Sequence, residues 1–86
     1  MKKVVFAGNM IVDNNLHIDS FPNLGMLEKI KSEDFCVGGS PCNSGIDFKT
    51  IDPSFEVSVI GKIGKDDKGK FILETLKTHN LITDKV

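Results

Sequence analysis

Short runs of apolar residues divide the chain into segments with different hydrophobic spacing. Within residues 2–8, Lys-Lys-Val-Val-Phe-Ala-Gly, four apolar residues stand together before Gly8. A second run, within residues 56–64, contains Val57, Val59 and Ile60. Apolar runs of this length, bounded by turn residues, are typical of strands buried on both faces of a sheet. We therefore predict two buried strands in these segments.

A polar break, Asp13-Asn14-Asn15, follows the first predicted strand. After it, two short segments alternate apolar and polar residues, with Pro22 and Gly25 between them as turn residues. This pattern predicts a partly solvated β-hairpin from about residue 15 to residue 37. Its apolar positions are Leu16, Ile18, Phe21, Leu27, Ile30 and Phe35.

Two further segments have helical features. Residues 40–51, Ser-Pro-Cys-Asn-Ser-Gly-Ile-Asp-Phe-Lys-Thr-Ile, begin with Ser40 as a candidate N-cap and Pro41 at the first helical position. Residues 66–80 place Phe71, Ile72, Leu76 and His79 close to the 3.6-residue period, with Asn80 as a stop. Apart from the hairpin, the predicted order is strand, helix, strand, helix, which implies an α/β fold with a parallel sheet.

The composition excludes several classes of function. The 86 residues suffice for one small domain, and the formal net charge is −1. The basic residues are dispersed lysines, whereas nucleic-acid binding requires a basic face, so we expect no nucleic-acid partner. No apolar run approaches the roughly 20 residues that span a bilayer. We predict a cytoplasmic protein that does not interact with membranes.

Cys36 and Cys42 are the only cysteines, and His17 and His79 the only histidines. The spacing of these four residues does not fit a zinc module. In a chain without a secretory signal, two cysteines are more often reduced, small hydrophobic residues than a disulfide. We predict no metal site and two free thiols.

The segment Val-Gly-Gly-Ser-Pro-Cys-Asn-Ser-Gly, residues 37–45, is open to two interpretations. Ser40 and Pro41 fit an ordinary junction between a loop and a helix. Gly38 and Gly39, in contrast, would let the backbone approach a ligand closely, and Asn43 offers both a hydrogen-bond donor and an acceptor. The segment is therefore either a plain junction or a binding site for a polar ligand.

Asp13 favours the binding site. It follows the carboxyl end of the first predicted strand, which is where ligands bind in open α/β sheets. A carboxylate there can accept hydrogen bonds from two neighbouring hydroxyls, as in sugar binding. The alternative is a solvated turn residue. The candidate substrate-binding residues are Asp13, Gly38, Gly39, Ser40 and Asn43.

Residues 64–70, Gly-Lys-Asp-Asp-Lys-Gly-Lys, match most of a phosphate-binding loop. Phe71 stands where that motif needs a hydroxyl for magnesium, and Asp66 and Asp67 would repel phosphate. We interpret the segment as a turn into the last helix, with Asp66 or Asp67 as its N-cap.

Taken together, these motifs resemble the N-terminal part of the ribokinase-like (PfkB) carbohydrate kinases. The resemblance rests on residues 37–45, on residues 59–81 (Val-Ile-Gly-Lys-Ile-Gly-Lys-Asp-Asp-Lys-Gly-Lys-Phe and onward) and on Ala-Gly-Asn-Met-Ile-Val-Asp at residues 7–13. It extends over nearly the whole chain. It implies the N-terminal part of a Rossmann-type parallel sheet, with the hairpin as an inserted lid.

The resemblance also implies a function. Members of the family use ATP and Mg²⁺ to phosphorylate a hydroxymethyl group of a sugar, a sugar phosphate or a nucleoside. By position, Asp13, Gly39 and Asn43 resemble the sugar-binding residues of the family. Ser40 stands where some members have a lysine, and Ile11 where ribokinases have an asparagine. Both departures argue against ribose itself as the substrate.

The second signature of the family, Gly-Ala-Gly-Asp, which supplies the catalytic base and the anion hole, does not occur in these residues. Residues 1–86 thus resemble the sugar-binding segment without the nucleotide-binding half, so we assign no catalytic or cofactor-binding residue and expect no activity from them alone. The apolar side chains of the hairpin suggest a homodimer through the lid. Two alternatives are a non-catalytic interaction or sugar-binding module and an unrelated nucleotide-binding α/β domain.

Overall fold

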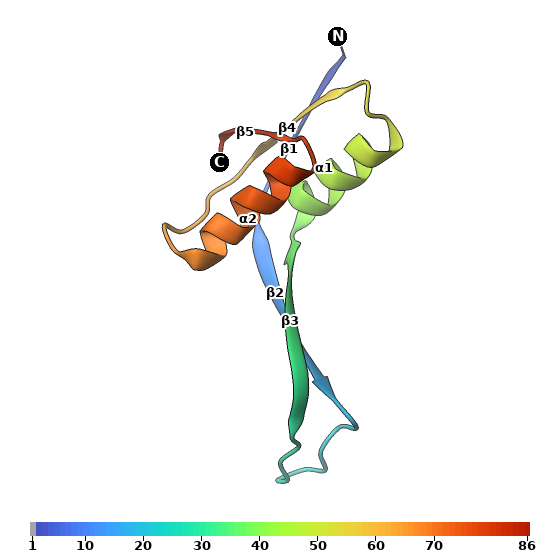
Figure 1. Ribbon diagram of the computed structural model, residues 1–86, viewed down its shortest axis with the longest axis vertical. Coiled ribbons are helices and arrows are strands. Elements are labelled where there is room, and N and C mark those ends of the chain that lie inside the picture. Colours follow the sequence, from blue (N-terminus) through green and yellow to red (C-terminus); the bar gives the residue numbers. More distant parts are fainter. Residues whose placement is uncertain (1) are drawn as a thin grey trace.

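The computed structural model, which describes residues 2–86, has a packed α/β part and a hairpin that projects from it (Figure 1). The principal extents are 56 × 29 × 19 Å, and the hairpin accounts for the long dimension (Figure 1). The elements, in chain order, are β1 (Lys3–Ala7), β2 (Ile11–Ile18), β3 (Ile30–Gly38), α1 (Ser40–Ile51), β4 (Glu56–Ile60), α2 (Asp67–Thr78) and β5 (Ile82–Lys85). Among residues 2–86, no helix is both long enough and apolar enough to cross a membrane.

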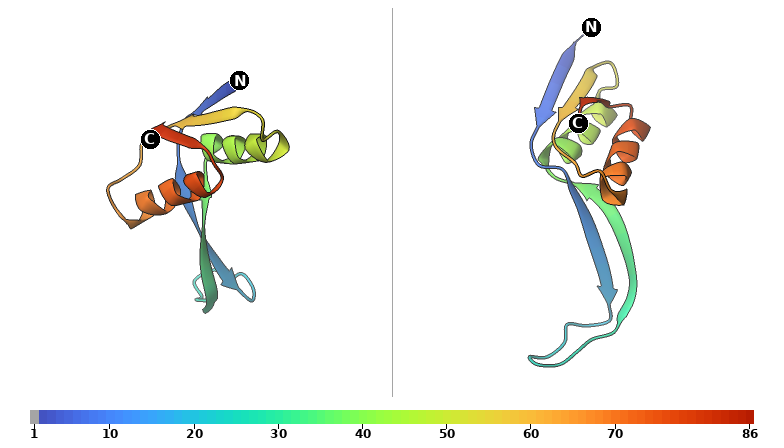
Figure 2. Two further views of the ribbon diagram at one scale, coloured as in Figure 1. Left: turned by 45° about the horizontal axis from the view of Figure 1, so that its top comes forward. Right: turned by 90° about the vertical axis from the view of Figure 1, so that its left-hand side faces the viewer.

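A three-stranded parallel sheet, in the order β1-β4-β5, forms the centre of the packed part. Both crossovers, through α1 and α2, move across the sheet in the same direction, so right-handed connections place both helices on one side (Figure 2). The opposite face is open, and Val5 is 55% exposed there. The prediction that the first strand is buried on both faces is therefore wrong, because only one face has a covering layer.

The core lies between the sheet and the two helices. Val57 and Val59 of β4 face the helices and are at most 1% exposed. Gly45 allows α1 to approach β4 closely, since a Cβ at this position would lie 3.0 Å from Cγ1 of Val59. The buried apolar residues are Cys42, Val57, Val59, Ile72, Leu76 and Leu81.

The ends of α2 follow from local hydrogen bonding. Asp66 is the N-cap, and its Oδ1 accepts a hydrogen bond of 2.8 Å from the N–H of Gly69, as predicted. At the other end, Asn80 adopts a left-handed conformation with φ of 62°. The N–H of Leu81 donates to the carbonyl of Leu76, which completes a Schellman motif and confirms the predicted stop at Asn80.

Strand β5, residues Ile82–Lys85, was not predicted. It has four residues, of which Asp84 and Lys85 are charged, so neither its length nor its apolar content suggests a strand. Pairing with β4 creates this strand, and the sheet therefore has one more member than the sequence indicated.

The hairpin begins earlier than residue 15, at Ile11, and it ends at Gly38. Asp13, Asn14 and Asn15 lie within β2, so the prediction of a polar break at these residues is wrong. Successive side chains in a strand point to opposite faces, and a two-stranded ribbon leaves much of both faces in contact with water. Consecutive polar residues can therefore lie within it. Phe21 and Leu27, predicted on the strands, lie in the connecting loop.

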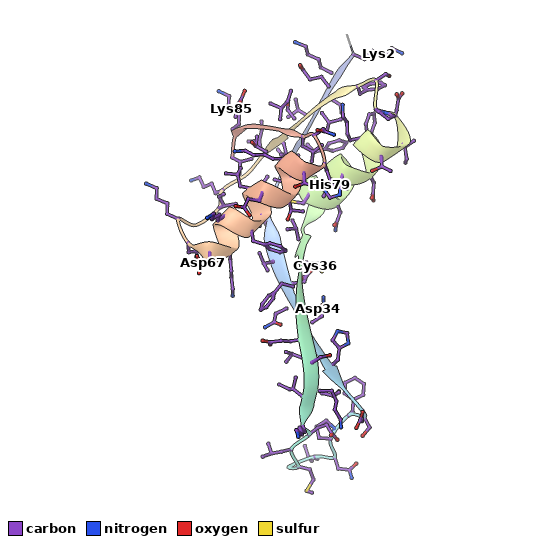
Figure 3. All side chains as sticks on the ribbon, in the orientation of Figure 1. Lys2, Asp34, Cys36, Asp67, His79 and Lys85 are labelled. Carbon is purple, nitrogen blue, oxygen red and sulfur yellow. The ribbon has the colours of Figure 1, made fainter. Side chains whose placement is uncertain are left out.

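The two faces of the hairpin differ in character. One carries the pairs Asp13–Cys36 and Asn15–Asp34, while the other carries Val12–Val37 and Leu16–Glu33. On the first face Nε2 of His17 lies 3.0 Å from Oδ2 of Asp34, and Asn15 donates to Sγ of Cys36 at 3.4 Å. Asp34 and Cys36 are labelled along β3 in Figure 3. The hairpin is thus polar on the side of Asp13 and more apolar on the other.

Candidate functional site

The candidate site lies where the hairpin joins the packed part. Strand β1 runs into the hairpin at Ile11, and the hairpin returns at Gly38 directly into α1. The carboxyl ends of β1 and β4 meet at this edge of the sheet, since the two strands are parallel and paired in register. This is the edge at which ligands bind in open α/β folds.

Asp13 lies over the first glycine of the pair. A Cβ at Gly38 would be 2.6 Å from Oδ2 of Asp13 and 3.5 Å from its Cγ, so a side chain at this position would displace the carboxylate from its place over the backbone. Gly38 itself is buried, whereas the side chain of Asp13 is exposed. The structure therefore brings together two of the predicted site residues, with the carboxylate open to solvent and to a ligand.

Gly39 has a different requirement. Its φ is 93°, which side chains with a Cβ rarely adopt, and a Cβ there would overlap the carbonyl oxygen of Asn9. The glycine is thus explained by a close approach of the chain after β1. The sequence interpretation, in which the glycine pair serves a ligand directly, missed this structural role.

The start of α1 is shifted by one residue from the prediction. Gly39, not Ser40, is the N-cap, and no side chain caps the helix. Pro41 consequently lies at the second helical position, where its missing N–H is equally harmless. Ser40 and Asn43 are exposed in the first turn, and the N–H of Asn43 donates to the carbonyl of Gly39 at 2.9 Å. Their side chains remain accessible to a ligand.

The structure brings only some of the five predicted residues into contact with one another. Asp13 lies over Gly38, and residues 38–43 continue from the hairpin into the first turn of α1. Within residues 2–86, no hydrogen bond joins Asp13 to Asn43 or to Ser40. The arrangement places an acceptor, a glycine pair and an amide around one junction, without direct hydrogen bonds from Asp13 to the other two side chains.

Two cavities flank this junction. One, of about 510 Å³, lies at the carboxyl ends of β1 and β4. Its lining residues Asn9, Met10 and Lys62 were not among the predicted site residues, although their position directly after the two strands could have indicated them. The lining consists of Ala7, Gly8, Asn9, Met10, Ile11, Ile60, Gly61 and Lys62.

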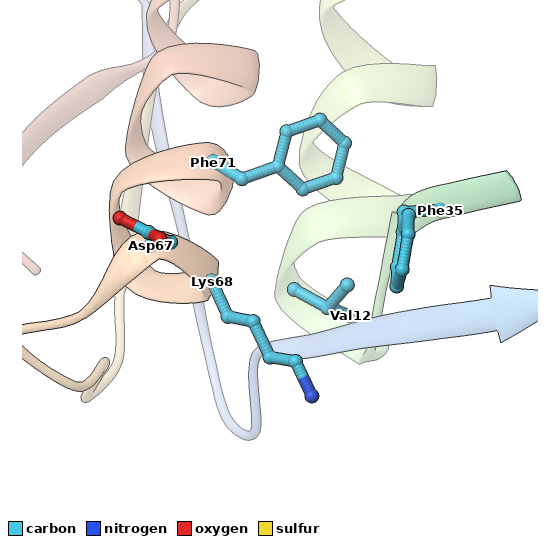
Figure 4. Close-up of a pocket in the computed structure, with 5 residues that line it drawn as sticks. All are labelled: Val12, Phe35, Asp67, Lys68 and Phe71. Atoms are coloured by element: carbon cyan, nitrogen blue, oxygen red, sulfur yellow. The ribbon is translucent and has the colours of Figure 1, made fainter.

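The other cavity, also about 510 Å³, lies between the more apolar face of the hairpin and the start of α2. Figure 4 shows Phe71, Val12 and Phe35 pointing into the same space, with Asp67 and Lys68 at its border. Phe71 follows the turn that resembles a phosphate-binding loop. A Cβ at Gly69 would overlap the carbonyl oxygen of Gly64, so the two glycines of that turn pack against each other.

The cysteines differ in environment, and neither is in a disulfide. Cys42, in the first turn of α1, is fully buried, and burial raises the pKa of its thiol above the ordinary value. Cys36 is exposed on the polar face of the hairpin. Within residues 2–86, no group of three or more His, Cys, Asp or Glu side chains could hold a metal ion.

The fold and the position of the site define an α/β domain with a parallel sheet, a projecting hairpin and a polar junction at the carboxyl edge of the sheet. No family model matches the chain. Its sequence is 34% identical over 88 residues to a ribokinase from Lactococcus lactis, covering 100% of this chain and 28% of the relative. It is 30% identical over 83 residues to a 5-dehydro-2-deoxygluconokinase from Bacillus thuringiensis, covering 96% of this chain and 23% of the relative.

Solved structures show the same similarity. The crystal structure of Sa239 superposes with a TM-score of 0.83 and 27% identity, covering 98% of this chain and 27% of that one. A nucleoside kinase of the ribokinase family from Methanocaldococcus jannaschii has the same fold, with a TM-score of 0.78 and 21% identity over 99% of this chain and 28% of that one. The chain spans about a quarter of the length of the curated relatives it matches. The resemblance to the ribokinase-like carbohydrate kinases is confirmed along the whole of these residues.

Proposed function

We propose that these residues form the sugar-binding portion of an ATP-dependent carbohydrate kinase that phosphorylates a hydroxymethyl group of a sugar or nucleoside. The observation that carries the proposal is the carboxylate of Asp13 over Gly38, at the entrance to α1. The similarity to kinases of sugars and a sugar acid supports the substrate class. It favours this function over that of an unrelated nucleotide-binding domain.

The residues at the junction suit a polyol. Asp13 can accept hydrogen bonds from two neighbouring hydroxyls, and Asn43 can both donate and accept. Gly38 keeps the space above the backbone free for the carboxylate, and Ser40 adds a hydroxyl at the exposed start of α1. In this proposal, the polar face of the hairpin forms a lid over the sugar.

ATP and Mg²⁺ are the phosphoryl donor and its metal in this proposal, and they are held by a longer kinase that contains this segment. The metal would supply charge stabilisation at the transferred phosphoryl group. The role of the present residues is to bind and orient the acceptor, which lowers the entropic cost of the transfer. We also predict a cytoplasmic location for the kinase.

The test of the acceptor site is calorimetry of a panel of sugars and nucleosides against Asp13→Asn and Asn43→Ala. Asp13→Asn should weaken sugar binding by about 1.5–3 kcal/mol, the usual loss for hydrogen bonds to a charged acceptor, and Asn43→Ala should act similarly. Asp47→Asn on the exposed side of α1 and Asn14→Ala on the other face of β2 are matched controls. Unchanged affinity in the first two variants would refute the assignment.

A second measurement addresses catalysis. Phosphoryl transfer needs a positioned nucleotide and a base near the acceptor oxygen, and we assign neither to these residues. Residues 1–86 should therefore release no ADP from ATP in a coupled assay with any sugar of the panel. Turnover that persists after repurification and disappears in Asp13→Ala would contradict this expectation.

The exposed apolar side chains of the hairpin favour a second role, association of two copies through the lid. Leu16 and Ile30 are each 50% exposed and Phe35 is 48% exposed, while the loop places Phe21 and Leu27 almost fully in solvent. A two-stranded ribbon cannot cover such a surface by itself. Light scattering should show a dimer that Ile30→Lys dissociates. A monomer in both proteins would eliminate this role.

A further inference from the structure

The cavity between the hairpin and α2 is bounded by three apolar side chains that come from three different elements. Val12 of β2, Phe35 of β3 and Phe71 of α2 point into the same space (Figure 4). The volume of about 510 Å³ falls within the range of about 300–1,000 Å³ that is usual for cavities that bind small molecules. The hairpin and α2 therefore form one apolar cavity of the size that a small ligand needs.

The two aromatic rings of this cavity have no aromatic partner within the chain. Among residues 2–86, the two pairs of contacting rings both include Phe48, and they contain neither Phe35 nor Phe71. Phe35 is 48% exposed, so its ring is accessible from solvent. Aromatic rings bind one another edge to face or in offset stacks, beyond the effect of apolar burial. A ligand ring in this cavity would supply the partner that both phenylalanines lack.

Lys68 is the only cationic residue in the lining of the cavity. Its side chain extends from the first turn of α2 toward β2, whereas the carboxylate of Asp67 points away from Phe71 and Val12 (Figure 4). None of the three ion pairs among residues 2–86 involves Lys68. Apolar walls with one ammonium group at the border suit a ligand that carries a single negative charge.

This cavity lies on the opposite face of the hairpin from the proposed sugar site. Val12 and Asp13 are consecutive residues of β2, and successive side chains of a strand point to opposite faces. Phe35 and Cys36 alternate in the same way on β3, and Cys36 pairs with Asp13 on the polar face. A ligand in the cavity therefore does not compete with a sugar for Asp13.

We infer that the cavity between the hairpin and α2 binds a small aromatic anion, with its ring against Phe35 and Phe71 and its negative charge at Lys68. The inference goes beyond the proposed function, because it uses none of the residues assigned to the sugar. Such a ligand contacts the hairpin on one side and the packed part on the other.

The test is a set of NMR titrations of the 86-residue protein with hydrocinnamate, its uncharged amide and hexanoate. The amide lacks the charge, and hexanoate lacks the ring. Hydrocinnamate should shift the backbone amides of Lys68 and Phe71 and give nuclear Overhauser effects to the methyl groups of Val12. It should bind about three- to fivefold more tightly than either of the others, as expected for one accessible ion pair or one aromatic contact. High salt should abolish its advantage over the amide.

Two variants with matched controls test the named contacts. Lys68→Gln should lower the affinity for hydrocinnamate about three- to fivefold, to that of its amide. Lys70→Gln, at an exposed lysine of the same helix outside the lining, should leave it unchanged. Phe35→Ala should lower the affinity about tenfold, whereas Phe21→Ala in the exposed loop should have no effect. All four residues lie outside the buried core, so the variants should retain the dispersed amide spectrum of the native protein.

Several results would overturn the inference. They are an absence of shifts at Lys68 and Phe71, equal affinity for hydrocinnamate and either of the other probes, and equal effects of Lys68→Gln and Lys70→Gln. If hydrocinnamate binds only after Ile30→Lys has dissociated a dimer, a second copy occupies the cavity and the inference is overturned as well. Asp13→Asn should not change the binding of hydrocinnamate, so the sugar site and this cavity are tested separately.

Discussion

The packed α/β part and the hairpin of this protein are stabilised in different ways. The packed part buries Val57, Val59 and Leu76 almost completely. The hairpin has its backbone pairing and a few exposed side-chain contacts, such as the one between His17 and Asp34. It contacts α1 through β3 and α2 through both of its strands, and its far end projects away from the packed part (Figure 1).

The difference shows in the dimensions of the molecule. A compact chain of this length would have a radius of gyration of about 12 Å. The observed Cα value is 16.3 Å, because the hairpin extends away from the core. An element with so little burial is stable only if its base is held in place or if a ligand or partner covers it. The junction at Gly38 and Gly39, which carries the candidate site, is therefore also the mechanical connection between the two parts.

The largest expected effect distinguishes a core leucine from a hairpin leucine. Leu76→Ala should reduce the free energy of unfolding by about 2–5 kcal/mol, because it removes a fully buried side chain and leaves a cavity. Leu27→Ala, at a residue that is 98% exposed, should change it by no more than about 0.5 kcal/mol. Urea denaturation followed by circular dichroism measures both. Similar losses in the two variants would show that the loop is packed in solution.

The next effect compares two glycines with positive φ. Gly39→Ala should destabilise the protein by about 2 kcal/mol or more, because it combines backbone strain with an overlap against Asn9. Gly25→Ala in the hairpin loop has a φ of 79° and no neighbour within 4 Å, so only the strain of about 1 kcal/mol remains. The same denaturation experiment ranks them. Equal losses of unfolding free energy in the two variants would mean that the backbone at Asn9 can shift to accommodate a Cβ at residue 39.

The thiols give a third comparison, measured by alkylation and mass spectrometry. Cys36 should react at once in the native protein, while Cys42 should react only when the protein unfolds. The raised pKa of buried Cys42 also has a consequence for stability. Burial of the neutral Cys42 thiol contributes to the free energy of unfolding below the ordinary thiol pKa of 9.0. This contribution is lost as the pH rises above that value. Rapid native labelling of Cys42 would indicate that α1 opens locally.

The smallest effect concerns the hairpin at low pH. The hydrogen bond from His17 lowers the pKa of Asp34, with a smaller contribution from Asn15. A lowered carboxyl pKa contributes stability above the unfolded value of about 3.8, and this contribution disappears as the pH falls through the folded value. Amide exchange in β3 should therefore increase at acidic pH more in the native protein than in Asp34→Asn. Identical pH profiles would exclude a role for this pair in holding the hairpin.

Much of the fold could be predicted because its signals are local. Residues 40–51 form α1 as expected, and Asp66 and Asn80 bound α2 through hydrogen bonds within a few residues. The rule for parallel sheets depends only on the order of elements, and it directed attention to Asp13, which the structure places in β2, the strand that follows the carboxyl end of β1. The same rule also covers Asn9 and Lys62, but no distinctive residue pattern marks them.

The sequence by itself therefore determined the type and order of most helices and strands, and it carried the resemblance to ribokinase-like kinases. Caps, turns and periodicity act over a few residues, so they can be recognised in the sequence alone. Tertiary structure decided what depends on distant neighbours. It formed β5 by pairing with β4, left one face of Val5 uncovered, and gave Gly38 and Gly39 their roles through Asp13 and Asn9. A residue carries no local signal for a partner far away in the chain, and that is why these features appeared only in the folded molecule.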